Sequence, residues 1–131
     1  MQDSNIAGNL PSAVALAYIG DAVHSLYIRT MLVKRGIARS GELNSLALEY
    51  VTAEKQAEAY EKIKDALTED EAALFRRAFN STHLNKPKHA SGRSYRTATG
   101  LEAVLGMLSF TGNTARLREL MNMAYGESNT D

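Results

Sequence analysis

Apolar side chains recur at intervals of three and four residues along most of the chain, as they do on one face of an α-helix. No segment shows the regular apolar and polar alternation of a half-buried strand. The pattern therefore predicts an all-α fold in one domain over residues 1–131, with a short polar arm at about 1–9 and a frayed tail at about 126–131. The predicted helices span residues 10–34, about 42–67, about 68–79, about 92–110 and about 113–125.

Local signals define several of the helix ends. Asn9 or Ser12 can cap the first helix, and Thr68 and Glu71 have the spacing of a capping box for the third. The second segment could be two helices that are broken near Thr52. Helical spacing fails between residues 80 and 94, where Pro, Gly, Asn, Ser and His residues predict a loop.

The first predicted helix is apolar around most of its circumference but carries one acid near its middle. Asp21 is the only acid in residues 4–41, and the residues one turn away along its face, Ala17 and Ser25, are small. An ionised carboxylate on a buried helix is costly unless it is paired or binds a metal. Asp21 therefore indicates a cation site. The alternative is that the helix breaks at Gly20 and that Asp21 caps the part that follows.

The predicted helix over about 92–110 has the same arrangement. Glu102 is the only acid in residues 72–118, and its neighbours one turn away, Ala98, Thr99 and Gly106, are small or hydroxylic. The remaining flanks are apolar. Two apolar helices, each with one isolated acid among small residues, suggest a shared metal site.

Both acids lie in segments that carry a family resemblance. ALAYIGDAVHSLYIR, which contains Asp21, resembles the signature helix of the ribonuclease III superfamily, and YRTATGLEAVLGML, which contains Glu102, resembles its second acidic helix. The order and spacing match from about Leu10 to Tyr125, and two motifs about eighty residues apart are more specific than either alone. The chain is most similar to mini-ribonuclease III, a branch that has the nuclease domain without a double-stranded-RNA-binding domain.

The resemblance implies a homodimeric, ribonuclease III-like helical endonuclease domain in which Asp21 and Glu102 bind Mg²⁺ and are catalytic. Two carboxylates can hold Mg²⁺ with several of its waters in place, and such an ion can activate water and stabilise charge on a phosphate. The implied reaction hydrolyses phosphodiester bonds to 5′-phosphate and 3′-hydroxyl ends. The implied substrate is double-stranded or structured RNA, for this branch the precursor ends of large-subunit (23S) ribosomal RNA, and a ribosomal protein partner is left open.

The sequence departs from the larger ribonuclease III enzymes, which have four acids in each site. Ala17 stands one turn before Asp21 and Thr99 three residues before Glu102, where those enzymes have acids. The mini-ribonuclease branch is similar in having fewer acids, so the departure puts the number of metal ions in doubt and not the activity itself. Supporting roles near the site are expected for Asn80 and Thr99.

Positive charge is concentrated just before the helix that bears Glu102. The segment from Arg76 to Arg96 has six Lys or Arg residues, two His residues and no acid. Such a segment can bind phosphates, with an affinity that falls steeply as salt is added, although a solvated loop is the plainer explanation. The candidate RNA-binding residues are Arg76, Arg77, Lys86, Lys88, Arg93 and Arg96.

The first helix is apolar on more faces than one small core needs. A two-fold dimer interface or an ordinary monomer core would each explain the excess. His24, three residues after Asp21, could be a metal ligand, or a histidine that is packed or faces the dimer interface. The candidate interface side chains are Tyr18, Leu26, Tyr27, Ile28 and Met31.

Composition changes this picture little. Lys and Arg together number 15, as do Asp and Glu, so net charge says nothing about an anionic partner. The absence of Cys excludes disulfides and thiolate metal sites and is compatible with a reducing cytoplasm. Because we find no signal-peptide pattern and no uncharged apolar run of membrane length, we expect a cytoplasmic protein without a membrane partner.

Three functions remain open on this basis. The first is a Mg²⁺-dependent endoribonuclease. The second is a non-catalytic RNA-binding or ribosome-associated protein on the same fold, favoured if Asp21 and Glu102 are salt-bridged. The third is an unrelated helical interaction domain in which both acids are caps. Metal-dependent cleavage of an RNA duplex separates the first from the others, and salt-sensitive duplex binding separates the second from the third.

Overall fold

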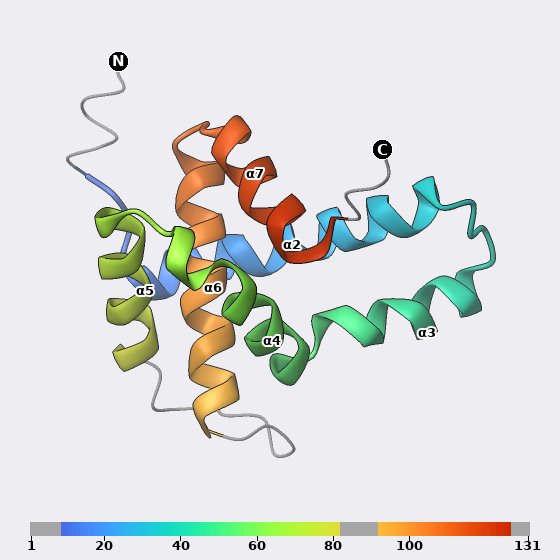
Figure 1. The fold of residues 1–131 in the computed structure, drawn as a ribbon, viewed down its shortest axis with the longest axis horizontal. Helices are drawn as coiled ribbons and strands as arrows, with labels where there is room; N and C mark the ends of the chain where they lie inside the picture. Colours follow the sequence, from blue (N-terminus) through green and yellow to red (C-terminus); the bar gives the residue numbers. More distant parts are fainter. Residues whose placement is uncertain (1–8, 82–91, 127–131) are drawn as a thin grey trace.

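The computed structural model describes residues 9–81 and 92–126, and within them the chain is helical without any strand, as predicted. None of these helices is long and apolar enough to cross a membrane. The predictions for residues 1–8 and 127–131 lie outside the described residues. The helices, labelled as in Figure 1, are α2 (Ala13–Lys34), α3 (Ser40–Val51), α4 (Ala53–Ile63), the 3₁₀ turn η1 (Lys64–Ala66), α5 (Glu69–Ser81), α6 (Gly92–Phe110) and α7 (Thr114–Tyr125).

Side-chain caps fix several helix ends where the sequence predicted them. Ser12 caps α2. Thr68 and Glu71 form the capping box, with the Thr68 amide donating to Glu71 Oε1 (2.9 Å) and the Glu71 amide donating to Thr68 Oγ1 (3.1 Å). Thr52 is extended (φ −68°, ψ 160°) and accepts a hydrogen bond from the Lys55 amide (3.2 Å). The second predicted segment is therefore two helices, α3 and α4.

The centre of the fold is the crossing of α2 and α6, which run roughly horizontally and vertically in Figure 1. A Cβ atom on Gly20 would overlap the carbonyl oxygen of Glu102, and one on Gly106 would overlap the carbonyl oxygen of Leu16. Glycine at both positions therefore lets the two backbones touch, which outweighs its poor helix propensity. Because α2 continues through Gly20, the alternative that Asp21 caps a second helix is wrong.

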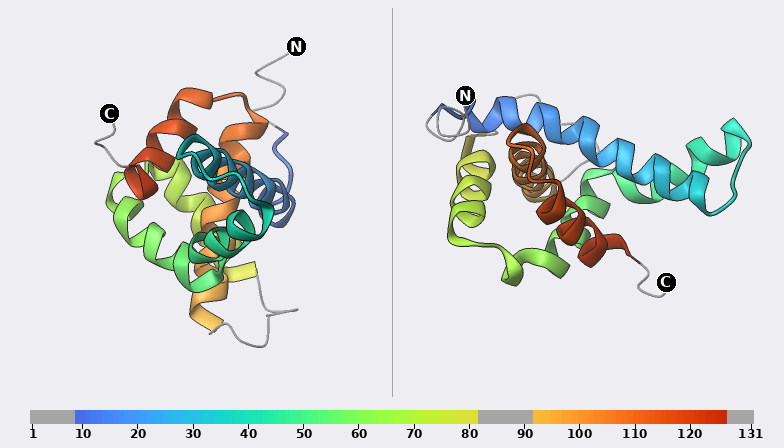
Figure 2. Two further views of the ribbon diagram at one scale, coloured as in Figure 1. Left: turned by 90° about the vertical axis from the view of Figure 1, so that its right-hand side faces the viewer. Right: turned by 90° about the horizontal axis from the view of Figure 1, so that it is seen from above.

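The other helices cover α6 and leave part of α2 projecting. Helices α4 and α5 pack on α6, and α7 packs on α4 and α6. Helix α3 forms a hairpin with the C-terminal half of α2, and this hairpin extends away from the other helices (Figures 1 and 2). No residue of α3 is fully buried. The largest fully buried apolar side chains are Leu16, Ile28, Leu32, Val104, Ile63, Leu105, Leu120 and Met121.

The candidate dimer residues divide between core and surface. Ile28 is fully buried, so its prediction as an interface residue is wrong, because it lies on the core-facing side of α2 with Leu32. Tyr18 and Leu26 are 83% and 68% exposed. Tyr27 and Met31 are half-buried, and their part in an interface stays a prediction.

Candidate active site

The crossing of α2 and α6 brings the two isolated acids together. Gly20 lies against the backbone of Glu102, and Asp21 is the next residue of α2. The Asp21 side chain is exposed, whereas Glu102 is partly buried. Burial raises the pKa of Glu102 to about 8, and the charge of the neighbouring Asp21 adds to the rise. Two carboxylates therefore share one partly open site, as a metal centre would require.

A third residue, Gln56 of α4, contacts this pair and was missed from the sequence. Its Nε2 donates to Glu102 Oε2 (3.1 Å) and to the carbonyl oxygen of Val51 (3.2 Å), and the first bond opposes the rise in the pKa of Glu102. Gln56 is 3% exposed. A signal existed, because Gln56 stands on the buried face of α4 with Ala59 and Ile63. Its partner, however, is 46 residues away, and spacing cannot reveal such a contact.

The acid pair has no compensating cation in the described part of the chain. No Lys or Arg in residues 9–81 and 92–126 forms an ion pair with Asp21 or Glu102. Those residues also contain no group of three or more metal-binding His, Asp or Glu side chains. Mg²⁺ usually takes one or two protein carboxylates and keeps several waters. The donor set therefore fits Mg²⁺ better than a metal that needs a full set of protein ligands.

His24 is packed in the core and is not placed to bind metal or a second protomer. It is 1% exposed, and its Nε2 lies 2.6 Å from the Tyr125 hydroxyl. The two rings meet edge to face with centroids 5.4 Å apart. Burial lowers the pKa of His24 to about 4, and the charge of Asp21 offsets only part of this. The imidazole is therefore neutral at pH 7 and ties α2 to α7.

Four of the candidate basic residues are exposed on α5 and α6. Arg93 and Arg96 lie in the first turns of α6, each with its guanidinium carbon 5.9 Å from the centre of the Phe79 ring. Arg96 precedes Glu102 by six residues, or about 9 Å along the helix axis. Arg76 and Arg77 are exposed on α5. The remaining two candidates, Lys86 and Lys88, lie outside the described residues.

The two predicted supporting residues differ in burial, and neither bonds to the acids in the part of the chain that the structure describes. Thr99 is buried one turn before Glu102, and its hydroxyl donates to the carbonyl oxygen of Tyr95 in the same helix (3.0 Å). Asn80 is exposed near the end of α5. No hydrogen bond joins either side chain to Asp21 or Glu102 within the described residues. Their supporting roles stay predictions.

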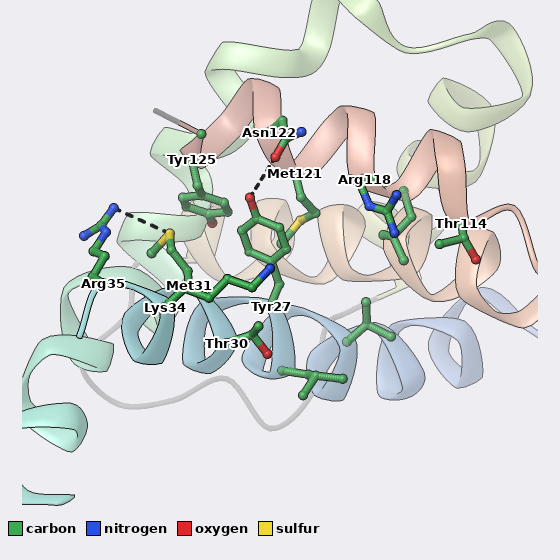
Figure 3. A pocket seen from close by; sticks show the side chains of 14 residues that line it. Tyr27, Thr30, Met31, Lys34, Arg35, Thr114, Arg118, Met121, Asn122 and Tyr125 are labelled. Atoms are coloured by element: carbon green, nitrogen blue, oxygen red, sulfur yellow. Dashed lines mark hydrogen bonds between the residues drawn. The ribbon is translucent and has the colours of Figure 1, made fainter. Parts of the chain in front are cut away.

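A groove of about 620 Å³ lies between α2 and α7, and neither acid lines it (Figure 3). Its walls are largely apolar and include Tyr27, Met31 and Met121. The Tyr27 hydroxyl donates to Asn122 Oδ1 (3.0 Å) across it. The groove carries none of the predicted chemistry, so the candidate active site is the acid pair.

Comparisons with known proteins identify the family of the chain. The ribonuclease III domain model matches residues 14–113, which include Asp21 and Glu102. Mini-ribonuclease 3 of Thermoanaerobacter sp. (strain X514) is 40% identical over 113 residues, which are 86% of this chain and 80% of that protein. Mini-ribonuclease 3 of Streptococcus pneumoniae (strain ATCC BAA-255 / R6) is 39% identical over 116 residues, which are 87% of this chain and 91% of that protein.

A solved structure has a fold similar to that of this chain. An X-ray crystal structure of a protein from Fusobacterium nucleatum superimposes with a TM-score of 0.78 at 28% identity, over 86% of each chain. Matches that extend over most of the chain and most of each relative leave no large part of the fold unaccounted for. The chain therefore belongs to the ribonuclease III family, and it is an endoribonuclease.

Proposed function

We propose that this protein is a Mg²⁺-dependent endoribonuclease that cuts double-stranded regions of structured RNA. The observation that supports it most is the pairing of Asp21 with Glu102 at the α2 and α6 crossing, where no cation of the described chain compensates them. A non-catalytic RNA-binding role would be favoured by a salt-bridged pair, and no such bridge occurs in residues 9–81 and 92–126. Names of the mini-ribonuclease 3 relatives also favour the nuclease.

The chemistry follows from the two carboxylates. Asp21 and Glu102 would hold Mg²⁺, which when bound supplies an activated water and stabilises charge on the phosphate and leaving oxygens. Glu102 must be ionised to do so, and its raised pKa means that a proton competes for it near neutral pH. Exposed Asp21 leaves the outer side of the site open to a phosphodiester. We expect products with 5′-phosphate and 3′-hydroxyl ends.

The exposed arginines on α5 and α6 would bind the RNA. Duplex RNA is recognised through its shape, its phosphates and its 2′-hydroxyl groups, because its deep major groove cannot be read by side chains. Arg93 and Arg96, which lie over the Phe79 ring, would bind phosphates near the N-terminal end of α6. The proposed RNA-binding set is completed by Arg76, Arg77, Lys86 and Lys88, with Asn80 and Thr99 in support.

A homodimer would allow one site to cut each strand. Helix α2 presents a row of exposed apolar side chains, with Val14, Tyr18, Leu26 and Val33 between 53% and 83% exposed. A second protomer would cover this row in an isologous interface. We also propose that residues 1–131 of each protomer form a single domain. The substrate class we favour is precursor 23S ribosomal RNA in the cytoplasm, with a ribosomal protein as an open further partner.

A cleavage assay tests the proposal. A long RNA duplex is incubated at low salt with the protein and either Mg²⁺ or EDTA. We expect cleavage only with Mg²⁺, and we expect Asp21→Asn and Glu102→Gln each to lower its rate by at least about 10²–10³-fold. Asp65→Asn, which removes an exposed acid on η1, is the control and should stay within about twofold. Salt-sensitive binding without cleavage would replace the nuclease with the binding function.

A further inference from the structure

Gln56 is a polar side chain in a place that packing alone would fill with an apolar one. It lies on the buried face of α4 with Ala59 and Ile63, and only 3% of it is exposed. A buried amide costs free energy unless its polar atoms are hydrogen-bonded. Its Oε1 is buried and has no hydrogen-bond partner in the described residues. The hydrogen bonds of Nε2 must therefore explain why a Gln is found at this buried position.

Both hydrogens of that nitrogen are used, and they connect two parts of the fold. One is donated to the carbonyl oxygen of Val51 (3.2 Å). Val51 is the last residue of α3, just before the break between α3 and α4. The other goes to Glu102 Oε2 on α6 (3.1 Å). The opposite amide orientation would place Oε1 against the carbonyl oxygen of Val51, which can only accept, so this contact fixes the direction of the donors.

We propose that Gln56 is a positioning residue for metal binding. It holds Oε2 of Glu102 from the α4 side and would thereby orient this carboxylate for a metal ion bound by Asp21 and Glu102. A hydrogen bond to a ligating carboxylate fixes its orientation, and loss of such a partner typically costs 10–100-fold in metal affinity or activity. The inference rests on the proposed function, because it requires Glu102 to be a metal ligand.

Mn²⁺ binding to the protein without RNA tests this role separately from catalysis. Bound and free Mn²⁺ are measured by electron paramagnetic resonance for the wild type, Gln56→Met and Glu102→Gln. Methionine keeps the length of the side chain but cannot donate a hydrogen bond. We expect Gln56→Met to weaken Mn²⁺ binding about 10–100-fold and Glu102→Gln to abolish it.

Ile63→Val is the matched control, because it also trims a buried contact on the same face of α4. It should change the melting temperature and leave Mn²⁺ affinity within about twofold. If Gln56→Met does not fold, Gln56→Leu is measured instead, with folding checked by circular dichroism. A second readout is the Mg²⁺ requirement for cleavage. Excess Mg²⁺ should restore much of the activity of the Gln56 variant but not that of Glu102→Gln.

The possible failures differ. If the wild type binds Mn²⁺ and Glu102→Gln does not, while Gln56→Met binds as the wild type does, Gln56 is only structural and the proposed function stands. If Glu102→Gln binds Mn²⁺ as well as the wild type, or neither binds it, the metal site itself is wrong and both proposals are overturned.

Discussion

Glu71 and Glu102 are carboxylates that pack into the same small core, yet their surroundings are opposite. Glu71 is 4% exposed and is held by Arg116, whose Nε and Nη2 donate to its two oxygens (2.9 and 2.8 Å). These bonds, above all, lower the pKa of Glu71. Burial raises the pKa of Glu102 to about 8, the second carboxylate of Asp21 adds to the rise, and the amide of Gln56 only partly opposes it. The fold provides a cation for Glu71 but, within the described residues, none for Glu102.

The two acids differ in the partners that the fold provides for their oxygens. Glu71 links α5 to α7 and also closes the capping box with Thr68, so every oxygen has a partner that the fold provides. Glu102 has no cation in the described chain, and the exposed Asp21 carboxylate beside it adds negative charge. An ionised carboxylate that is partly buried without a cation is destabilising, and we propose that a bound metal ion offsets this cost at Glu102.

Removal of Arg116 should show the largest effect on stability. Arg116→Met leaves Glu71 buried without its cation, and we expect a loss of about 3 kcal/mol in the free energy of unfolding, measured by urea denaturation. Glu119→Gln is the control, because the exposed Glu119 also pairs with Arg116 and should cost at most about 0.5 kcal/mol. An equally small loss for Arg116→Met would show that the Glu71 pair is not structural.

The pH dependence of stability without metal should be opposite for the two acids. The raised pKa of Glu102 means that the folded state binds a proton more tightly than the unfolded chain, so its contribution is complete below pH 4.5 and is lost as pH rises to about 8. In EDTA, the wild type should lose about 2 kcal/mol relative to Glu102→Gln between about pH 5.5 and 7. Glu71, with its lowered pKa, loses its contribution as pH falls below 4.5.

Two features make the pH experiment specific. His24 is present in both proteins, so its own titration cancels in the difference. Added Mg²⁺ should restore the stability of the wild type above pH 7 but not affect Glu102→Gln, because the ion binds the ionised carboxylate. Parallel stability curves for the two proteins would mean that Glu102 is not held in an unfavourable environment.

Tyr125→Phe should have the smallest effect and tests where the metal site ends. It removes the hydroxyl that bonds to His24, and we expect a loss of about 1 kcal/mol in unfolding free energy with an unchanged Mg²⁺ requirement for cleavage. Tyr50→Phe, which removes a more exposed hydroxyl bond from Arg35, is the control for stability. A clear shift in the Mg²⁺ requirement would instead extend the metal site to His24.

Sequence patterns predicted the features that depend on local spacing. Helical periodicity placed the helices, the capping box placed Thr68 and Glu71, and isolation on apolar helices singled out Asp21 and Glu102. Ile28 was assigned to an interface because an apolar helix has more than one face that could be buried, and only packing decides which one is.

Contacts between distant residues were not predictable in this way. Gln56 meets Glu102 across 46 residues, and Arg116 meets Glu71 across 45. His24, three residues after Asp21, could be a metal ligand or a packed histidine by sequence, and its contact with Tyr125 shows that it is packed. A helical pattern fixes which face a residue occupies but not which helix that face meets.

If Asp21 and Glu102 share a divalent metal ion, anomalous X-ray scattering from crystals grown with Mn²⁺ will locate it. We expect an anomalous peak about 2 Å from a carboxylate oxygen of each acid, with Gln56 still donating to Glu102. The peak should be absent in Glu102→Gln crystals. A peak elsewhere in the molecule, with no scatterer between the two carboxylates at saturating Mn²⁺, would contradict the account.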